Sequence, residues 1–218
     1  RRELKIMTHI DKQHIDYTLY LVTDRSVMSD KSLEQAVEQA IQGGCTVVQL
    51  REKNITSREF FETAQRIKQI TDFYHIPLII NDRTDICLAV NAAGIHVGQQ
   101  DLPAKVVRSI VGPDKIIGVS AATLSEAMQA EQDGADYLGV GAMFATSTKT
   151  NTRPVTVEQL VQIKQAVQIP VVAIGGIQSS NAATLTKTGI DGIAVVSAIL
   201  AQENIAHAAE QLKACFTG

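Results

Sequence analysis

Short apolar runs alternate with segments of helical periodicity along almost the whole chain. The helical segments fall at residues 33–41, 58–74, 85–90, 103–111, 123–131, 157–167, 182–188 and 197–215. The apolar runs that precede them fall at residues 18–23, 46–50, 78–80, 95–97, 116–119, 137–140, 171–174 and 192–196. Runs this short and apolar are typical of strands buried on both faces, as parallel sheets require. The sequence therefore predicts eight consecutive β-α units.

Eight β-α units in a chain of this length match the lower size limit of a (β/α)8 TIM barrel. The alternative is a doubly wound open sheet, which has fewer strands and carries a Gly-x-Gly-x-x-Gly turn after the first of them. Here that turn is Asp24-Arg25-Ser26, without glycine. We therefore predict one α/β barrel over residues 17–218, preceded by a polar and mobile arm at residues 1–16. The active site is expected at the carboxyl ends of the strands.

Composition narrows the class of protein further. The chain is 45% hydrophobic and 20% charged, as in ordinary globular proteins, and its net charge of −3 argues against a nucleic-acid binder. No apolar run approaches the roughly 20 residues of a membrane span, and residues 1–14 lack the apolar centre of a signal peptide. The cysteines have no metal-ligand spacing, and Cys45 and Cys87 fall in predicted core elements. These features favour a cytoplasmic protein with small-molecule partners, and a homo-oligomer is compatible with them.

Two aspartates follow neighbouring strands of one predicted β-α-β unit. Asp82 comes just after the strand at 78–80, and Asp101 follows the strand at 95–97. Adjacent parallel strands lie roughly 5 Å apart, so both carboxylates can reach one cation. A few oxygen ligands of this kind suit Mg²⁺ that carries phosphate. Either aspartate alone is equally well a helix cap or a turn residue. The pair predicts a metal site.

Other strand ends carry groups that bind anions. Strand alternation after residue 48 places Gln49, Arg51 and Lys53 on one side, and an arginine fork and a lysine ammonium both bind phosphate. Polar residues also end or follow the third, fifth and sixth strands: Asn81, Ser120, Thr146, Ser147, Thr148 and Lys149. For the sixth loop, an ordinary flexible polar loop is the competing interpretation.

The seventh and eighth strands end at Gly175-Gly176 and at Val196-Ser197. Loops at these two places form the usual phosphate site of a TIM barrel. The opposite side of the barrel mouth carries more positive charge than a monophosphate needs, which suggests a diphosphate there. No Ser/His/Asp or Cys/His pairing is visible, and His96 in the middle of a strand is interpreted as a packed or hydrogen-bonded core histidine.

The motifs YLVTD, QLREK, IINDR, GIHVGQQDLP, GVSA, DYLGVG, TSTK, AIGGI and VVSAI, taken together, resemble the thiamine-phosphate synthase family over about residues 17–200. That family joins a hydroxymethylpyrimidine diphosphate to a thiazole phosphate and releases pyrophosphate. The resemblance implies that the pyrimidine diphosphate is held by Gln49, Leu50, Arg51, Glu52, Lys53, Asn81, Ser120 and Lys149. It implies that the thiazole phosphate is held by Thr146, Ser147, Thr148, Gly176, Val196 and Ser197. It places Mg²⁺ on Asp82 and Asp101, and catalytic roles on Arg51, Lys53, Lys149 and Ser120.

The sequence departs from the family pattern in the sixth loop. Ala142 and Ala145 stand where family members often have proline, and residues 150–153 (TNTR) differ from the acidic and small residues expected there. Three rival functions fit these residues less well, because each calls for features that differ from those of this sequence. A thiazole tautomerase needs a histidine where Ala122 stands, and a non-catalytic phosphate-binding barrel needs no metal pair. A phosphosugar isomerase needs an acid and a base at opposite strand ends.

Overall fold

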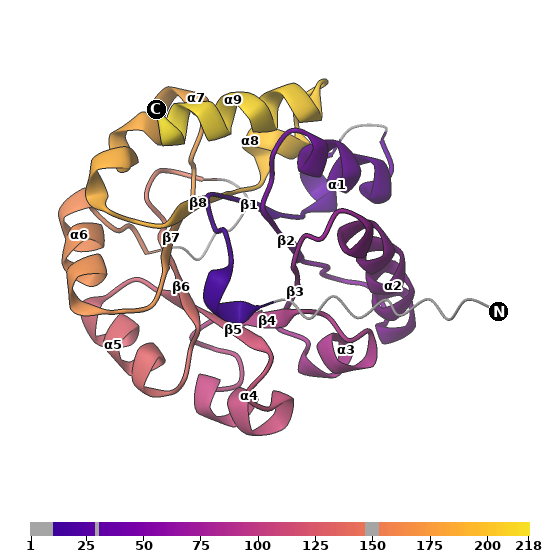
Figure 1. The fold of residues 1–218 in the computed structure, drawn as a ribbon, viewed down its shortest axis with the longest axis horizontal. Helices are drawn as coiled ribbons and strands as arrows, with labels where there is room; N and C mark the ends of the chain where they lie inside the picture. Colours follow the sequence, from indigo (N-terminus) through magenta and orange to yellow (C-terminus); the bar gives the residue numbers. More distant parts are fainter. Residues whose placement is uncertain (1–10, 29–30, 147–152) are drawn as a thin grey trace.

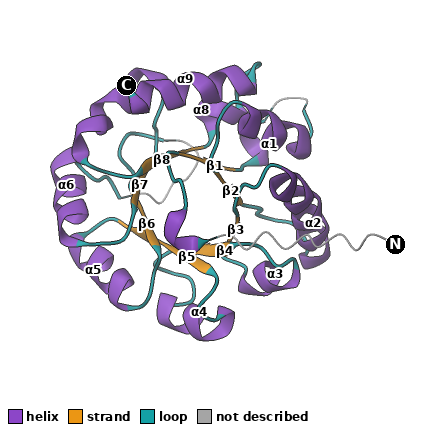
Figure 2. Ribbon diagram, viewed as in Figure 1, coloured by secondary structure: helices purple, strands orange, loops and turns teal. Residues whose placement is uncertain are grey.

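The structure is a computed structural model that describes residues 11–28, 31–146 and 153–218. Its centre is a closed barrel in which eight parallel strands pair in chain order and the last pairs with the first. The helices lie around the outside of this barrel (Figures 1 and 2). The strands are β1 Leu19–Val22, β2 Val47–Leu50, β3 Leu78–Asn81, β4 Gly94–Val97, β5 Ile116–Ala121, β6 Tyr137–Val140, β7 Val171–Ile174 and β8 Gly192–Val195. The prediction of a (β/α)8 barrel is confirmed.

At least one helix follows every strand. The helices are α1 Leu33–Gln42, α2 Ser57–Phe73, α3 Thr84–Ala89, α4 Ala104–Val111, α5 Leu124–Gln132, α6 Val157–Ala166, α7 Ser179–Ala182, α8 Ser197–Leu200 and α9 Ile205–Thr217, with 3-10 turns η1 Lys12–His14, η2 Arg25–Val27 and η3 Ala183–Thr188. Two predicted helices differ from the observed ones. The helix predicted at 182–188 is a 3-10 segment after the short α7. The helical region predicted at 197–215 is two helices, because Asn204 caps a new helix after a break.

Hydroxyl side chains start several of the outer helices. Ser32, Thr56 and Thr156 each accept a hydrogen bond from the backbone N–H three residues later, and a Gln or Glu at that position bonds back to the cap. The sequence from Thr123 to Glu126 has the same Thr-x-x-Glu pattern, but only half of the reciprocal box forms there. Thr123 caps α5, whereas the Glu126 carboxylate accepts from the Ala122 N–H and from Arg153.

Strand alternation produces two separate cores. Leu19, Leu21 and Leu50 face the helices, and all three are fully buried there. The barrel interior is filled by a smaller cluster that includes Tyr20 and Tyr137. Burial on both faces explains why the strands read as continuous apolar runs. Gln49 and His96 are buried polar residues of β2 and β4, and both line the cavity at the carboxyl end of the barrel.

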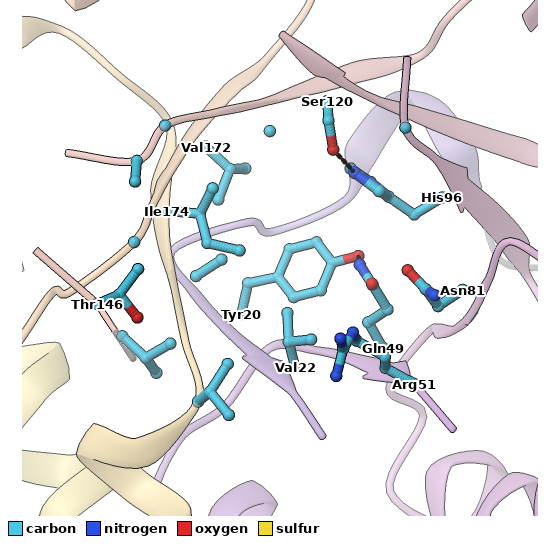
Figure 3. A pocket seen from close by; sticks show the side chains of 18 of the residues that line it. Tyr20, Val22, Gln49, Arg51, Asn81, His96, Ser120, Thr146, Val172 and Ile174 are labelled. Atoms are coloured by element: carbon cyan, nitrogen blue, oxygen red, sulfur yellow. Dashed lines mark hydrogen bonds between the residues drawn. The ribbon is translucent and has the colours of Figure 1, made fainter. Parts of the chain in front are cut away.

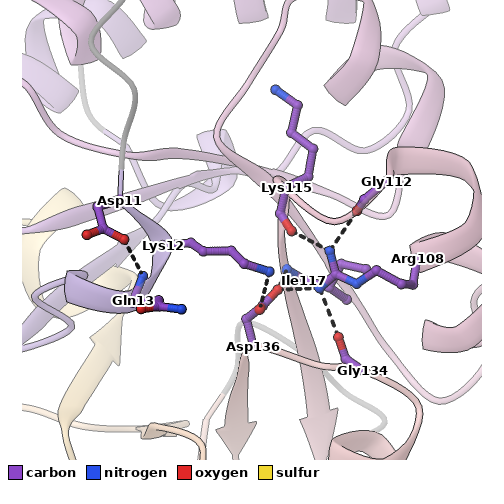
Figure 4. A network of polar contacts seen from close by, with 9 residues as sticks. All are labelled: Asp11, Lys12, Gln13, Arg108, Gly112, Lys115, Ile117, Gly134 and Asp136. Atoms are coloured by element: carbon purple, nitrogen blue, oxygen red, sulfur yellow. Dashed lines mark hydrogen bonds and ion pairs between the residues drawn. The ribbon is translucent and has the colours of Figure 1, made fainter.

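A hydrogen-bond network closes the opposite, amino-terminal end of the barrel (Figure 4). The Arg108 guanidinium donates to the carbonyls of Gly112, Lys115 and Gly134 at 2.9, 2.6 and 2.9 Å, and it also pairs with the Asp136 carboxylate. The same carboxylate accepts from the backbone of β5 and from Lys12 of η1, at 3.0 Å for the Lys12 Nζ. Residues 11–16 were predicted to belong to a mobile polar arm, but the Lys12–Asp136 contact holds this segment against the barrel.

Arg108→Ala is expected to lower the free energy of unfolding by about 2 kcal/mol, because three carbonyls and one carboxylate lose their donor. Chemical denaturation monitored by circular dichroism measures this. The matched control is Lys12→Ala, which breaks a partly exposed ion pair on the same carboxylate and should cost less than about 1 kcal/mol. A similar loss in both variants would contradict the central role of Arg108.

Among the described residues, no helix combines the length and the apolar character that crossing a bilayer requires. Cys45 and Cys87 are buried and unpaired, and Cys215 is half-buried. Burial raises the pKa of Cys45 to about 12 and that of Cys87 to about 11, so both stay as inert thiols at neutral pH.

Candidate active site

A cavity of about 660 Å³ opens at the carboxyl ends of the strands, and every strand of the barrel contributes to its wall. This volume is in the usual range for a small-molecule site. The predicted site residues that line it are Gln49, Arg51, Lys53, Asn81, Asp82, Asp101, Ser120, Thr146, Gly176, Val196 and Ser197. Figure 3 shows Gln49, Arg51 and Asn81 together on one side of the cavity and Thr146 on the other. Ser147, Thr148 and Lys149 lie outside the described residues.

Two residues of the QLREK motif do not line the cavity. The Leu50 side chain is fully buried in the outer core, under the helices. Glu52 is 9% exposed, and its carboxylate accepts from the Arg25 side chain at 2.7 Å. The alternation of strand side chains explains both positions, since Gln49, Arg51 and Lys53 take the inward-facing places. The side chains of Leu50 and Glu52 therefore lie outside the cavity, where Leu50 packs in the outer core and Glu52 pairs with Arg25.

The two cations of this motif are partly neutralised by neighbouring carboxylates. Arg51 Nη1 donates to Asp24 at 2.8 Å, which orients the guanidinium from the end of β1. Lys53 Nζ lies 2.6 Å from Asp82 Oδ2 at the edge of the cavity. The Lys53 side chain is half exposed, and an exposed ion pair contributes little free energy, so Lys53 can turn to an incoming anion. The Arg51–Asp24 pair is mostly buried, so it holds the guanidinium in place at the cavity.

Asp82 and Asp101 meet at the ends of β3 and β4, as predicted. Partial burial opposes ionisation of Asp82, but the hydrogen bond from Lys53 and the contact with Asp101 outweigh it and hold the pKa of Asp82 below its usual range. Burial and the neighbouring Asp82 carboxylate raise the pKa of Asp101, although the Gly98 N–H donates to it at 2.7 Å. The Asp82 carboxylate disfavours a negative charge on Asp101, and a cation bound between the two carboxylates would relieve that repulsion.

This donor set fits a divalent cation that binds mainly through its substrate. Within the described ranges, no three His, Cys, Asp or Glu side chains gather closely enough for an all-protein metal cage. A pair of carboxylates is the usual protein contribution to Mg²⁺, which keeps water and phosphate oxygens as its other ligands. Asp82 also adopts φ 59°, a left-handed conformation that aspartate and asparagine tolerate better than most residues.

The other end of the cavity is built from glycines and short helices. Gly176 has φ 62°, and a Cβ atom there would lie 2.4 Å from the Ala145 carbonyl oxygen, so only glycine fits. Ser197 opens α8 directly after β8, and Val196 precedes it in the cavity wall. Because Gly176 has no side chain, an anion can approach the backbone N–H groups at this end of the cavity.

Several cavity residues were not predicted from the sequence. Tyr20 and Tyr137 belong to the apolar floor, yet their hydroxyl groups bond to each other at 2.6 Å. Gln99 donates to the Ser120 carbonyl at 2.8 Å, and Arg153 pairs with Glu126 at the rim. Strand alternation is the signal that could have identified Tyr20, because Tyr20 and Val22 lie on the same face of β1, inside the barrel. His96 is buried and hydrogen-bonded, so the prediction of a core histidine is confirmed.

Comparison with known proteins agrees with this geometry. A family model described as thiamine monophosphate synthase matches residues 19–199. The chain belongs to the thiamine-phosphate synthase family. A thiamine-phosphate synthase of Ruminiclostridium cellulolyticum is 60% identical over 94% of this chain and 98% of its own length. One from Clostridium tetani is 57% identical with the same coverage. The solved structure of a thiamine phosphate pyrophosphorylase from Pyrococcus furiosus is 41% identical, has a TM-score of 0.86, and covers 93% of this chain and 96% of that one.

Membership of the thiamine-phosphate synthase family makes the chain a transferase of thiamine biosynthesis. The position at which a tautomerase would need a histidine is Ala122, and this alanine lies in the cavity wall. The relatives at 57–60% identity are named as synthases. The resemblance seen in the strand-end motifs is therefore confirmed.

Proposed function

We propose that this member of the thiamine-phosphate synthase family joins 4-amino-2-methyl-5-hydroxymethylpyrimidine diphosphate to 4-methyl-5-(2-hydroxyethyl)thiazole phosphate, and releases thiamine phosphate and pyrophosphate. The observation that carries the proposal is one cavity with two different anion-binding ends. One end has Arg51, Lys53 and the carboxylate pair, and the other has Gly176 and Ser197. A diphosphate and a monophosphate divide naturally between them.

Asp82 and Asp101 would hold Mg²⁺ at the diphosphate end. When bound, Mg²⁺ neutralises charge on the diphosphate oxygens and on the pyrophosphate that leaves. The two carboxylates keep this positive charge at one end of the cavity, away from Gly176 and Ser197. Lys53 shares the Asp82 carboxylate in the structure, so it is placed to turn toward a phosphate oxygen when a metal takes its place.

The proposed reaction breaks the bond between carbon and diphosphate before the thiazole attacks. The aminopyrimidine ring stabilises the positive charge on the methylene carbon, and Arg51 and Lys53 stabilise the negative charge on pyrophosphate. Lys149 is expected to act with them, and Thr146, Ser147 and Thr148 to bind the thiazole phosphate. The thiazole nitrogen is already a nucleophile and needs no base. His96 fits this view, since Tyr137 and Ser120 engage its two ring nitrogens.

Pyrophosphate release tests the proposal most simply. With both substrates and Mg²⁺ present, we expect one pyrophosphate for each thiamine phosphate formed. Omission of either substrate, or chelation of Mg²⁺ with EDTA, should reduce the rate to background. Pyrophosphate release without the thiazole phosphate at the full rate would indicate a hydrolase and contradict the proposed reaction.

Ser197→Ala is expected to weaken binding of the thiazole phosphate about tenfold, because a hydrogen bond to a charged group is lost. Binding of the pyrimidine diphosphate should change much less. Ser120→Ala is the mirrored variant, and it should weaken the pyrimidine diphosphate instead. Isothermal titration with each substrate measures both effects. Equal losses for both substrates in Ser197→Ala would contradict the division of the cavity.

We also propose a cytoplasmic location, supported by the two buried free thiols, since a reducing compartment keeps such cysteines unpaired.

A further inference from the structure

A continuous chain of hydrogen bonds crosses the floor of the cavity and joins two of its predicted substrate contacts. Gln49 Nε2 donates to the Tyr20 hydroxyl at 2.8 Å, and the Tyr20 and Tyr137 hydroxyls are 2.6 Å apart. The Tyr137 hydroxyl lies 2.9 Å from His96 Nδ1, and His96 Nε2 lies 2.9 Å from Ser120 Oγ. Figure 3 shows Gln49 against the Tyr20 hydroxyl and Ser120 against the His96 ring.

Two glycines in neighbouring strands leave space for the rings of this hydrogen-bonded chain. A Cβ atom on Gly118 would lie 2.1 Å from the Tyr137 ring, so β5 must have glycine there. A Cβ atom on Gly139 would lie 3.1 Å from the His96 ring, which is tighter than ordinary contact. Tyr20 and Tyr137 are at most 1% exposed, and burial raises the pKa of both hydroxyls, so both remain protonated. Buried hydroxyls of this kind need partners for their hydrogens.

Each hydrogen bond in the chain sets the direction of the next. Tyr20 accepts from Gln49, and its own hydrogen has the Tyr137 oxygen as acceptor. Continued in this direction, the chain has Tyr137 donate to Nδ1 of His96, and a ring with its hydrogen on Nε2 then donates to Ser120 Oγ. Two free functions result at the cavity wall. Gln49 presents its Oε1 as an acceptor, and Ser120 presents its hydroxyl hydrogen as a donor.

We propose that Tyr20, Tyr137 and His96 act as positioning residues that impose this donor and acceptor pattern, and that the pattern selects an aminopyrimidine over its oxo analogue. The inference rests on the proposed function, in which Gln49 and Ser120 contact the pyrimidine diphosphate. An aminopyrimidine has a donor on its amino group beside an acceptor on its ring nitrogen. The oxo analogue has an acceptor and an N–H in the same places, so each of its polar groups would meet a group of its own kind.

The hydrogen-bonded chain Gln49–Tyr20–Tyr137–His96–Ser120 forms a relay. Tyr137→Phe tests this relay, because it removes the central hydroxyl and keeps the ring. Wild-type protein should bind the aminopyrimidine diphosphate at least about tenfold more tightly than the oxo analogue. In Tyr137→Phe the preference should fall to about threefold or less, because Gln49 and Ser120 can then reverse independently. Titration without the thiazole phosphate measures binding apart from chemistry. Tyr20→Phe cuts the same relay one step earlier and should behave alike if Tyr137→Phe folds poorly.

Tyr17→Phe is the matched control. Tyr17 is 4% exposed and packs on Tyr137 with ring centroids 4.8 Å apart, but its hydroxyl has no hydrogen-bond partner among the described residues. The preference of this variant for the aminopyrimidine should equal that of the wild type. An unchanged preference in Tyr137→Phe, or an equal loss in Tyr17→Phe, would overturn the proposal.

The ¹⁵N spectrum of His96 tests the relay without any substrate. We expect the neutral ring to carry its hydrogen on Nε2 in the wild type and to lose that strong preference in Tyr137→Phe. A hydrogen on Nδ1 in the wild type would overturn the direction proposed for the relay. If the wild type forms no thiamine phosphate, the proposed function fails, whereas this spectrum still decides the relay.

Discussion

Replacing the methyl group of the pyrimidine diphosphate with trifluoromethyl should slow the chemical step by several orders of magnitude. The proposed reaction develops positive charge on the pyrimidine methylene, and an electron-withdrawing group destabilises that charge. Every 1.4 kcal/mol or so of lost stabilisation slows the step about tenfold. Arg51, Lys53 and the carboxylate pair line the cavity, and in the proposed arrangement they face the leaving group and would not compensate at the carbon.

Single-turnover rates at saturation with both substrates measure this effect. Binding should change little, because the substituent touches neither the diphosphate nor the metal site, and titration of the two pyrimidine diphosphates provides that control. A direct displacement develops little charge at carbon and would be almost indifferent to the substituent. Equal single-turnover rates would therefore rule out the dissociative reaction.

Asp82→Asn should reduce metal-dependent turnover by at least about a thousandfold, because the leaving pyrophosphate loses most of its charge stabilisation. Asparagine is the better substitution than alanine, since Asp82 has φ 59° and asparagine tolerates that conformation. The change removes the negative charge, and the fold should stay intact. The melting temperature should change by only a few degrees, because the side chain serves the cavity and not the core.

A second readout separates metal binding from other defects of this variant. The Mg²⁺ affinity of the protein with pyrophosphate, measured by calorimetry, should fall in Asp82→Asn and in Asp101→Asn alike. The control Asp85→Asn changes an exposed carboxylate three residues away, which pairs with Arg83 outside the cavity wall. Normal activity of Asp82→Asn at limiting Mg²⁺ would contradict the metal assignment.

The strand ends were predictable because a closed parallel barrel brings all of them to one rim. Asp82 and Asp101 could be paired from the sequence, since consecutive parallel strands must end side by side. The cavity wall contains both, as expected. Leu50 and Glu52 show the limit of a motif. A contiguous run of residues alternates between two faces, so its side chains do not all enter the same cavity.

The hydrogen-bond relay could not have been predicted in the same way. Tyr20 and Tyr137 are separated by 117 positions, and within their strands both tyrosines read as ordinary core residues. Their contact depends on the barrel closing with a particular stagger and on the space left by Gly118. Lys12 and Asp136 are similar, because a polar segment before the first strand has no pattern that reveals its partner 124 residues away.

A crystal structure with thiamine phosphate, pyrophosphate and Mg²⁺ bound together would test the division of the cavity most directly. We expect the pyrophosphate beside Arg51 and Lys53, and Mg²⁺ to be held there by Asp82 and Asp101. The phosphate of thiamine phosphate should lie against the backbone of Gly176 and Ser197, at the other end of the cavity. The reverse arrangement, or both anions at one end with the carboxylate pair free of metal, would contradict the proposed function.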